Sequence, residues 1–553
     1  MRQQIFLSCY QQKSLLKIKM KGSKKILQSL KEKGIKYIFG IMGREAQAIL
    51  GNEVKGIKFI LTRHEFTAGI MAEVYARLTQ HPQVCWSTFG PGVTNLITAI
   101  ASAYLDRSPL IAISAQVERN QIDPKNTHQC LEQTKMLQPI TKDSYEVKKT
   151  NEIENTINSM FDLANNELKG PVFISIPIDV LAEEVKVIES KWKNRIKQNF
   201  NSKNINKLFK VIKQSNNPIL LIGNEAVRAG VSNELRKFVE KYKIPVLTTS
   251  AGKGIIPENH SFSLGAINKY INDILNGDIT KNIFKDVDLI ITLGYDYVED
   301  VKSNLWNVGK KKKIVRVSSL DNKTKKYFKP DLDVIGDLIL ILKEINQYEF
   351  NSNRKNNFEW FIEKKNYLLS HGKDFAPEKL MNVINAYLDE NSILVSDIGI
   401  HKQYAVLFSK VYSPKSFLCS NGLGTFGFAL PAAMAAKLAF PKRNILAITG
   451  DGGFHSVSHD LETAARYNLP ITIIVVKDGS FGLIKHYQIV GHGYEFIPSV
   501  NFGDIDFVKL AEANGCIGYR IKSYDELDAI LSEKPTKPRV IEVPIRYDYS
   551  FRS

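Results

Sequence analysis

The chain is poor in the features that mark exported, membrane-spanning or metal-cluster proteins. Its 553 residues include only five cysteines, with no Cys-x-x-Cys spacing, at Cys9, Cys85, Cys130, Cys419 and Cys516. This scatter argues against a disulfide framework and against a zinc site. No apolar run reaches the length needed to span a bilayer, and the apolar core of the basic opening segment is too short for a secretory signal. We therefore expect reduced, mostly buried thiols and a cytoplasmic protein without membrane segments.

The formal net charge of +18 at pH 7 does not by itself predict a nucleic-acid partner. Lysines are spread along the chain, and no known nucleic-acid-binding module appears. The run "GKKKKIVRV" at 309–317 is typical of a solvated turn before a strand. We expect small-molecule substrates and no nucleic acid. A phosphorylated substrate suits a basic surface, although charge alone does not establish one.

Apolar strand patterns alternate with amphipathic helix patterns in three successive blocks. This order predicts an α/β protein with three Rossmann-like, doubly wound parallel-sheet domains, since one core rarely serves a chain of this length. Polar connectors rich in Lys and Asn separate the blocks. We assign the three domains to residues 22–190, 205–345 and 374–547, after a basic N-terminal extension over residues 1–21. Translation starts at Met1 or at Met20.

Two acidic residues follow neighbouring predicted strands in the third block. Asp451 follows the buried-strand pattern "RNILAIT", and Asp478 follows "ITIIVV". Open parallel sheets bind ligands at the carboxyl ends of their strands. Ser480 follows in a turn, where we expect its carbonyl to be free, so that two carboxylates, this carbonyl and a diphosphate would form an octahedral Mg²⁺ site. A lone Gly-Asp-Gly is usually a turn, so the pairing is the specific signal. Glycines that let a ligand approach the backbone flank Asp451 at Gly450, Gly452 and Gly453.

This pairing resembles the diphosphate-binding motif of thiamine diphosphate (ThDP) enzymes. In that motif Gly-Asp-Gly is followed by a metal-binding Asn or Asp at the spacing seen here, 27 residues from Asp451 to Asp478. Many relatives have two asparagines where this chain has Lys477-Asp478, a change that adds a charge without removing a ligand. The resemblance implies ThDP and Mg²⁺ as cofactors. It also implies that the three domains are, in chain order, the pyrimidine-binding (PYR), central and diphosphate-binding (PP) domains.

The resemblance further implies a glutamate in the first domain that faces N1′ of the cofactor's pyrimidine ring. Glu65 in "LTRHEFTAGIMAEVYAR" matches it, and "STFGPGVTNLITAIASAYLDRSP" follows, as in the acetolactate synthase-like branch. A carboxyl in a largely apolar cleft can share a proton with N1′ and so promote the imino tautomer that deprotonates thiazolium C2. Taken alone, Glu65 is equally typical of a surface carboxylate at a helix start. The metal motif disfavours that interpretation.

Three more residues of the third domain are implied to bind the cofactor by "SNGLGTFGFALPAA" and "DIGIHKQYA". Gly424 matches a residue whose carbonyl meets the pyrimidine amine. Phe426 matches the residue beneath the bent cofactor, with a core aromatic as the alternative. His401 is assigned to the neighbourhood of the diphosphate. In this family the PYR domain of one subunit meets the PP domain of another, which implies a homodimer or homotetramer. The family's central domain sometimes holds FAD, for which this sequence offers no support.

Several segments resemble carboxyethylarginine synthase more than acetolactate synthase, among them "NTHQCLEQTKMLQPITKDSYEV" and "GLIKHYQIVGH". The likeness implies a transferase of specialised metabolism. Such an enzyme joins glyceraldehyde 3-phosphate to the amine of arginine or a related amino acid through an acryloyl-ThDP intermediate. His128 and Gln129 match residues beside the reacting carbon, in catalytic and substrate-binding roles. Asp296 matches an acidic contact for a cationic substrate. The alternatives are a hydrogen-bonded loop histidine for His128 and a strand-end cap for Asp296.

Two rival functions remain open. "SNGLGTFG" is closer to acetolactate synthases than to the arginine-using enzyme, and Lys477-Asp478 also departs from the usual pair. An acetolactate synthase or a related pyruvate carboligase or decarboxylase is therefore the alternative. A catalytically inert regulatory protein on a ThDP scaffold is a third hypothesis, which the presence of Glu65 argues against.

Overall fold

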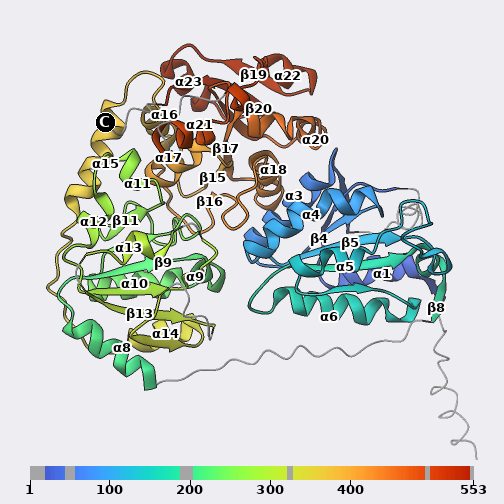
Figure 1. Ribbon diagram of the computed structural model, residues 1–553, viewed down its shortest axis with the longest axis horizontal. Coiled ribbons are helices and arrows are strands. Elements are labelled where there is room, and N and C mark those ends of the chain that lie inside the picture. The colour runs from blue at the N-terminus through green and yellow to red at the C-terminus, as the bar shows by residue number, and fades with distance from the viewer. Residues whose placement is uncertain are drawn as a thin grey trace, which may run out of the picture.

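The computed structural model of the chain describes residues 19–43, 56–186, 203–299, 301–309, 311–320, 328–491 and 498–547. Three six-stranded sheets, each parallel throughout and flanked by helices, follow one another along the chain (Figure 1). The expected fold class is therefore confirmed. In the described part of the chain, no helix combines the length and the apolar character that a membrane crossing requires.

The first sheet has the strand order β3-β2-β4-β5-β7-β6. Its strands are β2 (Tyr37–Gly40), β3 (Lys58–Leu61), β4 (Gln83–Ser87), β5 (Leu110–Gln116), β6 (Ser144–Glu146) and β7 (Val172–Pro177). One face carries α3 (Glu65–Thr79) and α4 (Pro91–Leu105), and the other carries α1 (Gly22–Glu32) and α6 (Ile153–Asn165). Two short helices, α5 (Gln133–Leu137) and α7 (Ile178–Ala182), complete the domain.

The expected extension over residues 1–21 ends inside this domain. Strand β1 (Lys19–Lys21) pairs antiparallel with β8 (Glu184–Lys186), so residues 19–21 belong to the first domain. The remainder of that extension, residues 1–18, lies outside the described residues.

The central sheet has the strand order β11-β10-β9-β12-β13-β14. Its strands are β9 (Pro218–Ile222), β10 (Val246–Thr248), β11 (Ser263–Ala266), β12 (Leu289–Leu293), β13 (Lys313–Ser318) and β14 (Leu332–Ile335). Its helices are α8 (Lys203–Gln214), α9 (Asn224–Ala229), α10 (Ser232–Tyr242), α11 (Ile271–Ile274), α12 (Ile279–Phe284), α13 (Ser303–Trp306) and α14 (Leu338–Ile345). The connector to the third domain contains a helix of its own, α15 (Glu359–His371).

The third sheet has the strand order β16-β15-β17-β18-β20-β19. Its strands are β15 (Ser392–Ser396), β16 (Phe417–Leu418), β17 (Asn444–Gly450), β18 (Thr472–Lys477), β19 (Ile517–Arg520) and β20 (Arg539–Pro544). Its helices are α16 (Pro377–Asn385), α17 (Ile400–Phe408), α18 (Ala429–Ala439), α19 (Asp451–His455), α20 (Leu461–Arg466), α21 (Gly482–His486), α22 (Phe507–Ala513) and α23 (Tyr524–Ser532).

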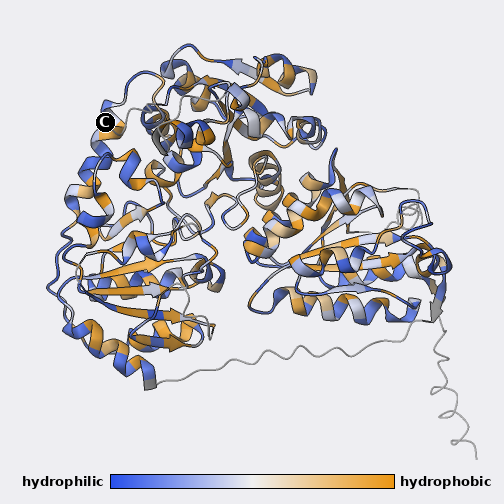
Figure 2. Ribbon diagram, in the orientation of Figure 1, coloured by the Kyte–Doolittle hydropathy of each residue, from blue (hydrophilic) through white to orange (hydrophobic). Residues whose placement is uncertain are grey.

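The strands read as near-continuous apolar runs because helices cover both faces of each sheet. All seven residues of β5 and all five of β12 are buried. Figure 2 shows the strands mostly in the hydrophobic colour and the helices with one polar side. This pattern explains why the three blocks could be separated from the sequence.

The first and third domains of the chain share a hydrophobic core. Helix α3 packs on α18, and their side chains join those of α4 and the third sheet in one buried cluster (Figure 1). Gly69 makes the close contact of α3 with α4 possible, since a Cβ there would lie 2.4 Å from Cβ of Ala99. Helix α3 begins at Glu65, where the side chain of His64 caps the helix by accepting the amide of Phe66 at 3.1 Å.

Candidate active site

The two predicted acidic residues meet at the carboxyl edge of the third sheet. Strands β17 and β18 pair in parallel, and each ends directly before an aspartate. Asp451 is buried, and its Oδ2 accepts the backbone amides of Asp478 at 3.2 Å and of Gly479 at 2.7 Å. Its Oδ1 accepts the amide of Gly452 at 2.8 Å. These bonds join the two strand ends into one rigid loop pair.

The local electrostatics of this loop pair favour a cation. Burial, followed by the nearby Asp451 carboxylate, raises the pKa of Asp478 to about 6. Burial also raises the pKa of Asp451, against the lowering effect of the amides that donate to it. A divalent cation between the two carboxylates would stabilise both in their charged form. The donor set of hard oxygens fits Mg²⁺.

The protein alone does not complete such a metal site. No group of three or more His, Cys, Asp or Glu side chains within the described ranges could hold a metal ion. The hydroxyl of Ser480 donates to Asp478 at 3.1 Å, and its carbonyl accepts the amide of Gly482 at 2.9 Å. The expectation of a free Ser480 carbonyl was therefore wrong, because the tight turn satisfies it locally; one lone pair remains for a ligand. The remaining ligands would have to come from a diphosphate and water.

The glycines around Asp451 are required by side chains that crowd the loop. A Cβ on Gly450 would lie 3.4 Å from the His401 ring, and one on Gly452 would lie 2.9 Å from the Phe481 ring. A Cβ on Gly453 would lie 3.3 Å from the carboxyl carbon of Asp397. A side chain on Gly452 or Gly453 would therefore crowd its neighbours, whereas glycine lets a bound anion come close to the backbone of this loop.

His401 lies beside the diphosphate motif, where the sequence placed it. It is 4% exposed on α17, and its Nε2 has no hydrogen-bond partner among the described residues. Burial lowers its pKa to about 3, so the imidazole is neutral at physiological pH. A buried, unpaired ring nitrogen next to Gly450 fits a hydrogen bond to a bound ligand.

Asp397 is a residue of this edge that the sequence reasoning missed. It follows β15, is fully buried, and accepts the amides of Gly427 at 2.9 Å and Ala429 at 3.0 Å. It thereby fixes the loop before α18 to the end of β15. Its position after the strand pattern "SILVS" was the available signal, the same one that singled out Asp451.

The predicted pyrimidine-binding loop offers an open surface. Gly424 has φ +71° and no atom within 4 Å of the place a Cβ would take. Phe426 is 51% exposed, and its ring meets that of Phe481 edge to face at 6.2 Å. Phe426 is thus not a core aromatic. Its exposed face can contact a ligand. It lies beside the two loops that follow β17 and β18 and carry Asp451 and Asp478, called the metal loops below.

Glu65 is held at the first turn of α3 within its own domain. It is 7% exposed, and its Oε2 accepts a hydrogen bond from Nδ2 of Asn95 at 2.9 Å. A Cβ on Gly92 would lie 3.3 Å from its Oε1. Its neighbours reach the third domain of the same chain: the Arg63 amide donates to Asp460 at 2.8 Å. The glutamate is therefore a buried, oriented carboxyl and not a solvated helix-start residue.

His128 and Gln129 lie on an exposed loop that reaches the same end of the first domain. A Cβ on Gly90 would lie 2.9 Å from Cβ of Gln129, and Gly92 of the same turn touches Glu65. Gln129 therefore packs against the turn that passes beside Glu65. The catalytic and substrate-binding roles of these two residues stay predictions.

Asp296 already has a cationic partner within the chain. Its Oδ2 accepts a hydrogen bond from Nε of Arg107 at 3.2 Å, and the pair is largely buried between the first and central domains. Its Oδ1 accepts the amide of Val298 at 3.2 Å. The geometry favours the capping and bridging role over contact with a cationic substrate, which stays a prediction.

A buried carboxylate lies at the switch point of the central sheet, between β9 and β12. Glu299 is 3% exposed there and accepts the amide of Asn224 at 2.9 Å, at the start of α9. A Cβ on Gly223 would lie 2.7 Å from that carboxylate. The described residues of this crevice give no support for FAD, since a buried carboxylate lies where open α/β sheets bind dinucleotides.

Family comparisons agree with this geometry across all three domains. Residues 20–136 match the N-terminal TPP binding domain of thiamine pyrophosphate enzymes, 205–345 match their central domain, and 397–543 match their C-terminal TPP binding domain. The chain belongs to the thiamine diphosphate-dependent enzymes, in the acetolactate synthase-like family.

Individual relatives of known name indicate a reaction class within this family. The chain is 32% identical to the probable acetolactate synthase large subunit of Methanocaldococcus jannaschii, over 93% of this chain and 91% of that protein. It is 31% identical to the acetolactate synthase large subunit of Buchnera aphidicola (92% and 91%) and 29% identical to the acetolactate synthase of Bacillus subtilis (97% and 95%). These names favour the alternative function, and the expected closeness to carboxyethylarginine synthase is not shown.

Proposed function

We propose that the protein is a ThDP- and Mg²⁺-dependent carboligase of the acetolactate synthase type, which joins pyruvate, after loss of its carboxyl group as CO₂, to a second 2-oxo acid. The observation that carries the proposal is the joined pair of acidic loops at the ends of β17 and β18. There Asp451 accepts the amides of Asp478 and Gly479. The similarity to acetolactate synthases over more than nine-tenths of the chain supports the reaction class.

The residues at the sheet edge would bind the diphosphate end of the cofactor. Asp451, Asp478 and the Ser480 carbonyl would hold Mg²⁺, and His401 would lie beside the diphosphate. Asp451, Ser480 and His401 are buried, which limits water at this edge and strengthens each charge–charge contact. When bound, ThDP supplies a nucleophilic carbon and an electron sink for carbon–carbon bond chemistry.

Glu65 would control the protonation of the aminopyrimidine. Asn95 donates to one of its oxygens, so the other oxygen is the one that can hold or release a proton at N1′. Phe426 and Gly424 would form the surface that receives the ring. The exposed face of Phe426 fits this role better than a packing role.

We also propose that the site is completed in a homo-oligomer. Large apolar side chains are exposed around the metal loops, namely Leu423, Phe426, Phe481 and Ile484. Phe426 contacts Phe481, and Ile484 lies on the following helix α21. An apolar patch of this kind marks an interaction site, and a second copy of the chain is the partner we infer.

The test is the product formed by purified protein supplied with ThDP and Mg²⁺. With pyruvate alone, we expect acetolactate, detected by mass spectrometry and lost when Mg²⁺ is chelated. A second arm supplies glyceraldehyde 3-phosphate with arginine. An N-carboxyethyl amino acid in that arm, without acetolactate in the first, would overturn the carboligase assignment. It would instead support the carboxyethylarginine synthase-like function, in which His128 and Gln129 were predicted to act.

A further inference from the structure

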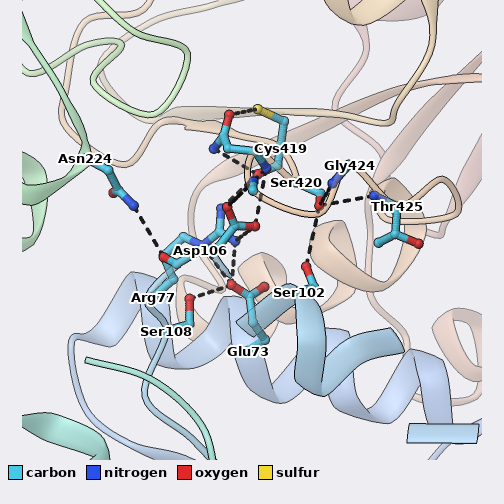
Figure 3. Close-up of polar contacts among 12 residues, drawn as sticks. Glu73, Arg77, Ser102, Asp106, Ser108, Asn224, Cys419, Ser420, Gly424 and Thr425 are labelled. Atoms are coloured by element: carbon cyan, nitrogen blue, oxygen red, sulfur yellow. Dashed lines mark hydrogen bonds and ion pairs between the residues drawn. The ribbon is translucent and has the colours of Figure 1, made fainter. Parts of the chain in front are cut away.

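Asp106 lies where the three domains of one chain meet. It directly follows α4, is 3% exposed, and its carboxylate accepts the amides of Gly422 at 2.8 Å and Asn421 at 3.1 Å in the third domain. Its backbone carbonyl accepts a hydrogen bond from Nδ2 of Asn224 in the central domain at 3.3 Å. Figure 3 shows Asp106 at the centre of these contacts.

A buried arginine connects this carboxylate to helix α3. Arg77 donates to Oδ2 of Asp106 at 3.2 Å and to the carbonyl of Cys419 at 2.9 Å, and it is paired with Glu73 one turn earlier on α3 (Figure 3). Ser108 donates to Glu73 at 2.6 Å. Because charges buried this deeply are costly unless they are paired, the network holds its geometry tightly.

The same network continues to the loop that carries Gly424. The hydroxyl of Ser420 accepts the amides of Gly424 at 3.2 Å and Thr425 at 3.3 Å, and it lies 3.5 Å from the hydroxyl of Ser102 on α4 (Figure 3). A Cβ on Gly422 would lie 2.5 Å from Cβ of Leu105. The loop from 419 to 425 is thus pressed against the first domain and held there by backbone hydrogen bonds.

Asp106, Arg77 and Ser420 have no described contact with the metal loops, yet they determine the position of the loop that carries Gly424. Gly424 itself has open space beside it, so no side chain packed on it fixes its position. Its position depends on the anchored amides on its N-terminal side and on the amides that Asp397 holds on its C-terminal side.

We propose that Asp106 is a positioning residue: its carboxylate, fixed by Arg77, sets the Gly424 loop so that the carbonyl of Gly424 can receive the amino group of the cofactor's pyrimidine. This inference rests on the proposed function. The diphosphate end of the site, by contrast, is positioned by the parallel pairing of β17 and β18 and not by Asp106. The two ends of the cofactor therefore depend on different parts of the chain.

This separation provides the test. Asp106→Asn keeps the size of the side chain but replaces one carboxylate oxygen by an amide NH₂ group, which must oppose either the backbone amides of residues 421 and 422 or the guanidinium of Arg77. Isothermal titration calorimetry would compare two probes in Mg²⁺ buffer: ThDP, which spans both ends of the site, and inorganic pyrophosphate, which occupies the metal end only. We expect the dissociation constant for ThDP to rise roughly tenfold, and that for pyrophosphate to stay within about twofold.

A matched control is Asp179→Asn. Asp179 also accepts a backbone amide and a guanidinium group, both from Arg119, but it contacts no residue of the third-domain loop. This variant should bind both probes as the unmodified protein does. Equal losses for ThDP and pyrophosphate in Asp106→Asn would indicate general damage to the third domain and overturn the positioning role, as would no loss for either.

A second variant tests the idea if Asp106→Asn does not fold. Ser420→Ala removes only the hydroxyl that accepts the amides of Gly424 and Thr425. We expect weaker ThDP binding with unchanged pyrophosphate binding, and unchanged binding of both would refute the inference. Unmodified protein that binds pyrophosphate but not ThDP would instead refute the proposed function, so the two failures are distinguishable.

Discussion

Replacing Asp478 with asparagine should make the cation-free protein more stable while keeping an oxygen ligand for Mg²⁺, so that Mg²⁺ and ThDP still stabilise the variant. Burial and the adjacent Asp451 raise the pKa of Asp478 from 3.8 to about 6. Each tenfold change in proton affinity corresponds to about 1.4 kcal/mol, so the charged form costs the folded state about 3 kcal/mol at neutral pH. Because Asp478 is partly exposed, we expect a gain of about 2 kcal/mol from the substitution.

The sign of the pH dependence follows from the direction of the shift. The folded state binds the proton of Asp478 more tightly than the unfolded state, so the cost is complete above about pH 6 and disappears as the pH falls towards 3.8. Asparagine carries no such cost. The advantage of the variant should therefore be full at pH 7.5 and should shrink steadily below pH 6.

Thermal unfolding with and without Mg²⁺ and ThDP would measure both effects. In EDTA at pH 7.5 the variant should unfold a few degrees higher than the unmodified protein. With the cofactor and metal present the difference should shrink, because the cation offsets the charge of Asp478 in the unmodified protein while asparagine still supplies a ligand. Asp525→Asn, at an exposed position of the same domain, is the control and should change neither midpoint appreciably. A variant no more stable than the unmodified protein in EDTA would refute the reasoning.

Two further predictions concern the first domain. Glu65→Gln should lower turnover about 100-fold or more while leaving ThDP affinity nearly unchanged, because glutamine can still accept a hydrogen bond from Asn95 but cannot exchange a proton. Steady-state kinetics would measure the turnover and calorimetry the affinity. Turnover within threefold of normal would contradict this role of Glu65. Gly69→Ala should destabilise the protein by about 1–3 kcal/mol, because the new methyl group would meet Ala99 on α4. In denaturant titrations Gly503→Ala is its control, having no atom within 4 Å, and equal midpoints for the two variants would contradict the packing argument.

The positions of Asp451 and Asp478 at one edge of the third sheet could be predicted because each residue is marked by its neighbours in the sequence. Each aspartate ends an apolar run and is followed by glycine, and parallel pairing of the two strands brings them together. The free carbonyl expected at Ser480 was wrong for an equally local reason, since its hydrogen bond to Gly482 depends on turn geometry that residue types do not specify. Asp397 carried the same strand-end signal and could have been found.

The Asp106 network could not be predicted in this way. Asp106 and Asn421 are 315 residues apart and belong to different domains. Nothing in either local sequence indicates which buried carboxylate meets which amide, because that pairing depends on how α3 and α4 dock against the third domain. Asp296 shows the same limit. Its partner Arg107 comes from another domain, and the pairing changes which role its charge can take.

Titration of ThDP into metal-free protein, before and after addition of Mg²⁺, tests the central claim most directly. That claim is that the acidic loops after β17 and β18 hold the cofactor's diphosphate through a divalent cation. We predict saturable binding at one site per chain that requires Mg²⁺ and is lost in Asp451→Asn. Absence of binding in Mg²⁺ buffer, or equal binding in EDTA, would contradict the account.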